Sequence, residues 1–73
     1  MGRELDVRGL LCPLPLLRAR AVLPTLGPGE ELVVLATDPE APVDLGALAA
    51  DEDCELRVER RDEALALVLW RRG

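Results

Sequence analysis

The chain has 73 residues, of which 49% are apolar, and fourteen acidic against nine basic residues give it a net charge of −5. We therefore expect one small domain over residues 1–73, and the negative charge and single aromatic residue argue against direct nucleic-acid binding. No apolar run is long enough to span a bilayer, and residues 1–7 lack the basic and apolar regions of a leader, so we expect a cytoplasmic protein that does not bind membranes.

The first predicted element is a strand over residues 4–8. Polar and apolar residues alternate there and place Leu5 and Val7 on one face, which is typical of a half-buried strand. Gly9 ends this strand.

A helix is predicted over residues 13–23. Its apolar residues recur with the spacing of one helical face, which would bury Leu16, Ala19, Leu23 and Leu26 with Val22 alongside. Because a proline lacks the backbone N–H, Pro24 is expected to end or kink the helix near Leu23.

The central region contains a second strand and a second helix. Residues 31–37 form an apolar run rich in β-branched residues, which predicts a strand covered on much of both faces. The helix over residues 42–50 begins at Pro42, follows the weak cap Ala41, and buries Leu45, Leu48 and Ala49.

The last two strands are predicted over residues 54–61 and 64–71, joined as a hairpin. Cys54, Leu56 and Val58 share the side that faces the core. The element order is βαβαββ, and two helices can cover only one face of a four-stranded sheet. The other face is solvated or paired, and Trp70 belongs either to the core edge or to that face.

Cys12 lies between two prolines where the first helix begins. If Cys12 immediately precedes the helix, Pro13 and Pro15 occupy its first and third positions, where a missing N–H costs no helix hydrogen bond. The N–H groups of Leu14 and Leu16 are then the nearest donors to the sulfur. The two prolines are expected to make the site rigid.

The position of Cys12 favours a reactive thiol. The positive end of the helix macrodipole stabilises a thiolate, and Arg8, Arg18 and Arg20 are the cations available to lower the thiol pKa further. A small buried hydrophobe is the alternative interpretation of Cys12. Two cysteines and no histidine cannot supply the four ligands of a structural zinc site, so no metal is expected.

The segments LDVRGLLCPLPLLRAR, GPGEEL and TDPEAPVDL, together with the βαβαββ order, resemble the TusA/SirA-like family of small sulfur carriers. The similarity runs from Leu5 to about Arg72, and the Cys-Pro-x-Pro motif is specific to that family. It implies an α/β two-layer sandwich, with a four-stranded mixed sheet and both helices on one face. It also implies that Cys12 carries persulfide sulfur, without a cofactor.

The resemblance also implies protein partners. The sulfur donor would be a cysteine desulfurase or a rhodanese-like protein, and the acceptor a DsrE-like protein or a thiolation enzyme. The relay would serve tRNA thiolation, the molybdenum cofactor or sulfur oxidation. We expect a monomer, with a weak dimer through the uncovered sheet face as the alternative.

Further residues match the family or depart from it. Asp38 matches the Asp of the family's Asp-Pro at the end of the second strand, and Asp44 matches an acidic position in the second helix. Both would support the site, although a turn and a carboxylate at a helix start are the simpler interpretation. Arg18 and Arg20 match basic positions that would meet a partner, or else form a solvated flank. Leu14 replaces a residue that is commonly polar, and with Leu17 and Ala21 it lies off the core stripe, which predicts an apolar docking strip.

Two other functions stay open at this stage. One is a non-catalytic interaction or regulatory module in which the prolines only start a helix. The other is a redox or selenium-handling protein. Cys54 is expected at the opposite end of the sheet from Cys12, which leaves it a packing role and makes a disulfide between them improbable.

Overall fold

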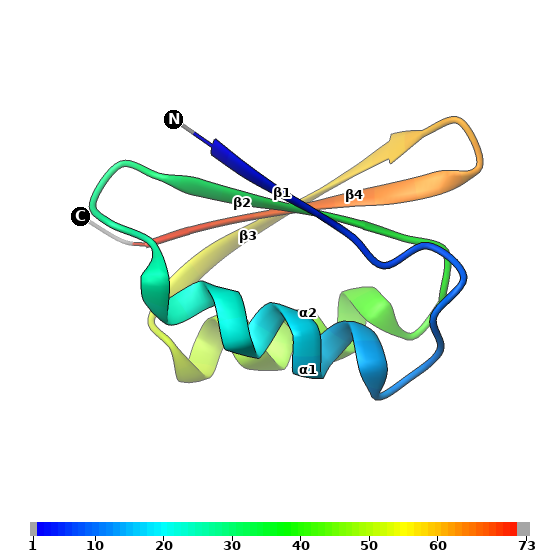
Figure 1. Cartoon of the computed structure of the whole chain (residues 1–73), viewed down its shortest axis with the longest axis horizontal. Coiled ribbons are helices and arrows are strands. Elements are labelled where there is room, and N and C mark those ends of the chain that lie inside the picture. Colours follow the sequence, from blue (N-terminus) through cyan, green and yellow to red (C-terminus); the bar gives the residue numbers. More distant parts are fainter. Residues whose placement is uncertain (1, 72–73) are drawn as a thin grey trace.

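The computed structural model describes residues 2–71. Residues 1, 72 and 73 of the predicted domain lie outside the described residues, and so does Arg72, at which the family resemblance ends. Figure 1 shows two layers, with both helices on one side of a sheet. This confirms the predicted α/β sandwich. The elements are β1 (Gly2–Asp6), α1 (Leu14–Val22), the 3₁₀ turn η1 (Leu23–Thr25), β2 (Glu31–Ala36), α2 (Ala41–Asp51), β3 (Cys54–Arg61) and β4 (Ala64–Arg71).

The four strands form one mixed sheet in the order β1-β2-β4-β3. β1 and β2 are parallel and are linked through α1, whereas β4 runs antiparallel to both of its neighbours. The carboxyl ends of β1, β2 and β3 therefore lie at one end of the sheet (Figure 1). The loops that follow β1 and β2 meet there, and Cys54 begins β3 at the opposite end.

The core lies between the sheet and the two helices. Its fully buried side chains include Leu32 and Val34 of β2, Leu67 and Leu69 of β4, and Leu45 of α2. Burying such a side chain contributes roughly 1.5–3 kcal/mol.

The buried face of α1 differs slightly from its predicted stripe. Ala19, Leu23 and Leu26 are buried, but Leu16 is only half-buried and Pro15 is fully buried in its place.

The sheet is covered on one face only, as predicted, but two strands are less covered than expected. Burial alternates along β2, because Val33 and Leu35 point to the open face and are only half-buried. Val58 of β3 is 46% exposed, although the core was predicted to cover it. β3 is the edge strand of the sheet, and it runs away from the helix layer towards the β3–β4 hairpin (Figure 1).

The open face has a small apolar centre of its own. Ala66 and Val68 of β4 are buried there, and Trp70 is half-buried on the same face. The guanidinium of Arg57 lies 5.6 Å from the centre of the Trp70 ring. Trp70 therefore belongs to the uncovered face and not to the core between the layers.

The bounds of β1, α1, β2 and α2 differ from the predictions by one or two residues, and physical reasons explain those of β1 and α1. β1 ends at Asp6, because Gly9 adopts a φ of 84° and turns the chain off the sheet. α1 begins at Leu14, with Pro13 as the residue before it. The helix gives way at Leu23 to a 3₁₀ turn that contains Pro24, as its missing N–H requires.

The structure of residues 2–71 contains no helix that is both long enough and apolar enough to cross a membrane.

Candidate functional site

Cys12 is exposed in the loop between β1 and α1, at the end of the sheet where the strand-to-helix loops meet. Its thiol donates a hydrogen bond to Oδ2 of Asp44, across 3.0 Å. Its backbone N–H donates to Oδ2 of Asp38, across 2.6 Å. Both partners come from the segment that leaves β2 and enters α2, so the parallel pairing of β1 with β2 builds the site.

Asp38 fastens the Cys12 loop to the start of α2. Its side chain is only 5% exposed, and its second oxygen accepts the N–H of Glu40 across 3.0 Å. Its carbonyl oxygen accepts the N–H of Ala41 across 3.0 Å. A buried carboxylate is stable only when such donors compensate its lost hydration. Asp38 therefore holds the Cys12 loop through the backbone N–H of Cys12.

Asp44 lies in the first turn of α2 and is half-buried. Its backbone N–H donates to the carbonyl oxygen of Glu40 across 3.1 Å, which keeps it in helical geometry. The side chain reaches out of α2 towards the sulfur. Among residues 2–71, Asp44 is thus the residue whose side chain accepts the hydrogen bond of the Cys12 thiol.

The carboxylates around Cys12 raise its pKa from 9.0 to about 11. The hydrogen bond to Asp44 has the largest effect, followed by loss of solvation and by the negative charges of Asp44, Asp38 and Glu40. This reverses the expectation of a thiolate favoured by the macrodipole. The macrodipole acts within the first turn, and Pro13 stands between Cys12 and Leu14, where α1 begins.

The backbone around the prolines is also arranged differently from the prediction. The N–H of Leu14 donates to the carbonyl oxygen of Leu11 across 2.9 Å and so does not face the sulfur. Pro13 occupies the position before the helix and Pro15 its second residue. The Cys12–Pro13 peptide bond is cis.

Arg8 does not serve as a counter-ion for Cys12. Its guanidinium donates to both carboxylate oxygens of Asp6, across 2.9 and 2.7 Å, and this pairing lowers the pKa of Asp6 to about 2. Arg18 and Arg20 are exposed on α1. The charges that shift the Cys12 pKa are all carboxylates within the described residues.

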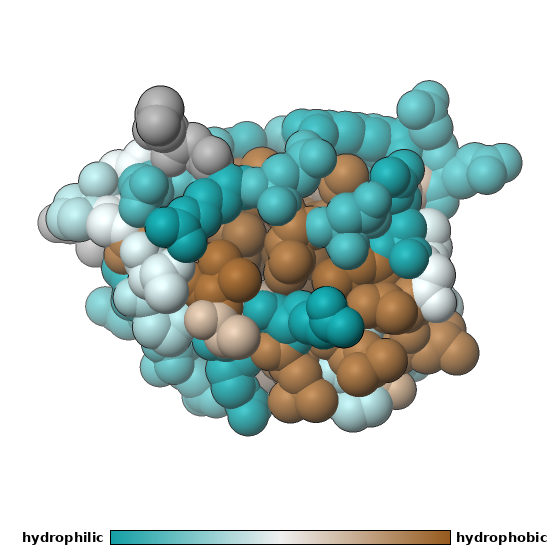
Figure 2. Space-filling view, viewed as in Figure 1, coloured by the Kyte–Doolittle hydropathy of each residue, from teal (hydrophilic) through white to brown (hydrophobic). Residues whose placement is uncertain are grey.

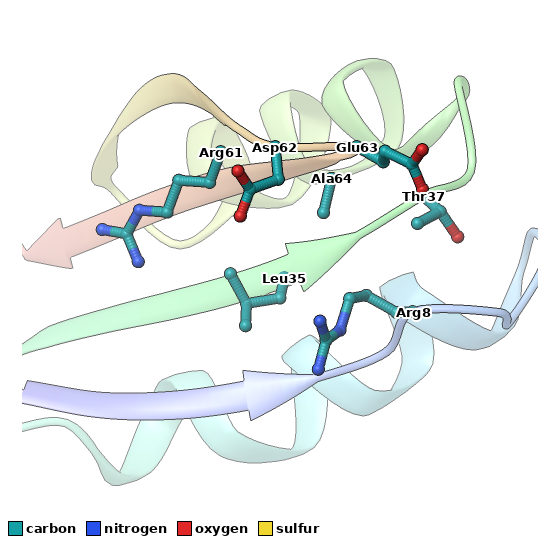
Figure 3. A pocket seen from close by; sticks show the side chains of 7 residues that line it. All are labelled: Arg8, Leu35, Thr37, Arg61, Asp62, Glu63 and Ala64. Atoms are coloured by element: carbon teal, nitrogen blue, oxygen red, sulfur yellow. The ribbon is translucent and has the colours of Figure 1, made fainter.

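Arg8 lines a separate pocket of 580 Å³ on the open face of the sheet. Figure 3 shows its guanidinium beside Leu35, with Thr37 and the hairpin residues around the opening. The residues around this pocket are Arg8, Leu35, Thr37, Arg61, Asp62, Glu63 and Ala64. Cys12 is not one of them, so the pocket is distinct from the thiol site.

Exposed apolar side chains lie on the Cys12 loop and near the amino-terminal ends of α1 and α2. Leu14 and Leu17 of α1 are 42% and 47% exposed, as expected for residues off the core stripe. Leu11 and Val43 are each 68% exposed, and the sequence reading did not single them out. Figure 2 shows apolar surface gathered over the amino-terminal part of α1. We call Leu11, Leu14, Leu17 and Val43 the apolar rim.

The family model named Sulfurtransferase TusA matches residues 3–71. The chain belongs to the TusA family. Membership of the TusA family supports a role as a sulfur carrier, which works with protein partners in a sulfur relay. Among residues 2–71, no three His, Cys, Asp or Glu side chains gather where they could hold a metal ion.

Individual known proteins also resemble the chain over most of its length. It is 44% identical over 61 residues to the sulfur carrier protein TusA of Allochromatium vinosum, which covers 84% of this chain and 79% of that protein. It is 38% identical over 68 residues to the putative sulfur carrier protein YrkI of Bacillus subtilis, which covers 93% and 89%. The crystal structure of a SirA-like protein of Desulfitobacterium hafniense superposes with a TM-score of 0.79 at 26% identity, and covers 94% and 93%.

Proposed function

We propose that the protein carries sulfur as a persulfide on Cys12. The observation that carries this proposal is an exposed thiol whose backbone is fixed by buried Asp38 and whose surroundings are the apolar rim. The transferred sulfur must leave the active site of one protein and enter that of another. The Cys12 side chain must therefore be exposed, and its backbone must be held in place. The rim supplies a surface on which a partner can exclude water.

The transfer is two exchanges between sulfur atoms. The Cys12 thiolate attacks the outer sulfur of a donor persulfide, and the donor's sulfur–sulfur bond breaks as the new one forms. The donor leaves as a thiolate and takes up the proton that Cys12 released. An acceptor thiolate then attacks the outer sulfur on Cys12 and returns Cys12 as a thiolate. Neither exchange needs an external oxidant or reductant.

The protein partners in this proposal are those that the family resemblance implies. A cysteine desulfurase or a rhodanese-like protein gives the sulfur, and a DsrE-like protein or a thiolation enzyme takes it. The carrier acts as a cytoplasmic monomer, without a cofactor and without direct contact with nucleic acid. tRNA thiolation, molybdenum-cofactor synthesis and sulfur oxidation are the relays it would serve.

The other predicted site residues have supporting roles. Pro13 and Pro15 restrict the backbone on the helix side of Cys12, and Asp38 restricts it through its N–H. Leu14, Leu17, Arg18 and Arg20 lie exposed along α1, where a partner that covers the thiol would meet them. Arg8 supports the loop after β1 through Asp6.

Sulfur loading tests the proposal directly. Incubation with a cysteine desulfurase and cysteine should add the mass of one sulfur atom, and reduction should remove it. Cys12→Ser should abolish the gain, whereas Cys54→Ser, which removes the buried thiol, should keep it. A sulfur that still loads on the Cys12→Ser protein would refute the assignment.

An interaction module is the second candidate, because a pKa of about 11 leaves the free thiol protonated at neutral pH. In that case Cys12 would have no chemical role, and a Cys12→Ala protein would support the cellular function as well as the wild type. Loss of function in that variant, with its fold retained, would favour the carrier.

A further inference from the structure

The charged groups that face the Cys12 sulfur are acidic on each element that packs against it. Asp38 and Glu40 come from the segment between β2 and α2, and Asp44 comes from α2 itself. Asp44 is the one that bonds the sulfur, with Oδ2 3.0 Å from Sγ. Arg8, the basic residue of the Cys12 loop, is bound to Asp6 through both carboxylate oxygens.

We propose that Asp44 selects the partners of Cys12: its carboxylate accepts the hydrogen bond of the thiol across 3.0 Å and favours a partner that places a positive charge beside the two residues. This proposal rests on the carrier function proposed above and adds the chemistry of the partner. The partner surface it describes is apolar and carries an Arg or Lys where it meets Asp44.

The selection follows from the charges of the two forms of Cys12. The protonated thiol donates to the carboxylate, so the pair carries one negative charge and one hydrogen bond. Loss of the proton removes that hydrogen bond and leaves two negative charges side by side, which disfavours the thiolate. A cation that binds both groups removes the repulsion, so the thiolate forms in the complex.

The apolar rim strengthens the effect of such a cation. Val43 precedes Asp44 and Leu11 precedes Cys12, and both are 68% exposed, so a partner reaches the pair across apolar side chains. Once these side chains are covered, water is excluded and the attraction between opposite charges grows. Charge selection at Asp44 and apolar contact at the rim therefore act together.

Disulfide exchange with small reagents of different charge isolates this selection. Cystamine is cationic, bis(2-hydroxyethyl) disulfide is neutral and dithiodiglycolate is anionic. In each case the Cys12 thiolate attacks one sulfur, forms a mixed disulfide and releases the other half as a thiol. Each rate is divided by the rate of the same reagent with free 2-mercaptoethanol, which corrects for the different leaving thiols. At low salt and pH 7.5 we expect the corrected rate of the wild type to be at least tenfold higher with cystamine than with dithiodiglycolate.

The variants identify Asp44 as the source of the selection. Asp44→Asn should react faster with all three reagents and bring their corrected rates within about threefold of one another, while Asp44→Glu should restore the order. Asp51→Asn removes an exposed charge at the far end of α2 and should behave as wild type. A wild type without charge preference, or an Asp44→Asn protein with the same preference, would overturn the proposal.

Salt and sulfur loading complete the test. If Asp44→Asn does not fold, the wild-type preference should still shrink severalfold at 1 M salt, because screening weakens exposed charge interactions. A preference that salt leaves unchanged contradicts the proposal.

Disulfide exchange does not require sulfur carriage. A protein that fails to load sulfur but keeps the preference would therefore refute the carrier function alone, and one that loads sulfur without the preference would refute the selection alone.

Discussion

Cys12 and Asp44 are 32 residues apart in the sequence, yet the thiol of one donates to the carboxylate of the other across 3.0 Å. The contact joins the loop before α1 to the first turn of α2. It gives the exposed sulfur an acidic neighbour where the helix start alone would favour a thiolate. The reactivity of Cys12 thus depends on an element that the local sequence around it does not contain.

Replacement of Asp44 should change the titration of Cys12. In Asp44→Asn, the pKa of the thiol should fall from about 11 towards its ordinary value of 9.0, because the hydrogen bond to the charged carboxylate is lost. Alkylation with iodoacetamide across pH 6–11 measures this pKa. Asp51→Asn is the control, and a midpoint near 11 in both variants would contradict the structure.

The same contact makes the stability of the fold depend on pH. The pKa of Cys12 is raised in the folded state, so its hydrogen bond stabilises the protein fully below pH 9 and is lost as the pH rises towards 11. Cys12→Ala should remove that part of the alkaline loss. Urea unfolding at pH 8 and pH 11 checks it. Equal alkaline losses in both proteins would show that the contact contributes nothing.

The ion pair of Asp6 with Arg8 should be visible by titration. The pKa of Asp6 is lowered to about 2, mainly because Arg8 hydrogen-bonds its carboxylate, so the pair contributes above pH 3.8 and is lost as the pH falls towards 2. Carboxyl chemical shifts measured by NMR should show this titration, and Arg8→Gln should return it to about 3.8. Both side chains are exposed, so we expect only a small change in stability.

Asp38 should matter for stability more than an exposed acidic residue does. Asp38→Ala leaves the N–H groups of Cys12 and Glu40 without their acceptor, and such a loss costs about 1–3 kcal/mol. Urea unfolding at pH 7 measures the change. Glu63→Ala, in the exposed hairpin turn, should change the free energy of unfolding by less than about 0.5 kcal/mol. Equal effects of the two variants would mean that Asp38 does not hold the loop.

The apolar rim should control transfer without affecting the fold. Leu14→Glu and Leu17→Glu should slow sulfur transfer from a protein donor by about tenfold, which corresponds to about 1.4 kcal/mol of lost binding. Val58→Glu changes an apolar side chain of similar exposure on β3 and should leave transfer unchanged. Transfer rates under subsaturating donor measure the effect. If the rim variants transfer as fast as Val58→Glu, the rim is not a docking surface.

The sequence by itself determined the element order, the cover of the sheet on one side and the place of Cys12 at the first strand-to-helix junction. Periodicity carries this information. The apolar residues of each element, such as those around Leu5, Ala19 and Leu45, recur with the spacing of a strand or of a helix. Leu14 and Leu17 were likewise readable as exposed, since they fall off the core stripe of one helix. These features depend on neighbours within a few residues, which is the range over which sequence patterns act.

Only the tertiary structure decided the chemical surroundings of the sulfur. The sequence offered Arg8 as a cation for Cys12. In the structure, however, the Arg8 guanidinium pairs with the carboxylate of Asp6, two residues away in the sequence. The parallel pairing of β1 with β2 brought the loop of Asp38 and the first turn of α2 to the thiol instead. A pKa depends on which charges lie within a few ångströms, and the chain sets those distances only when strands far apart in sequence pair.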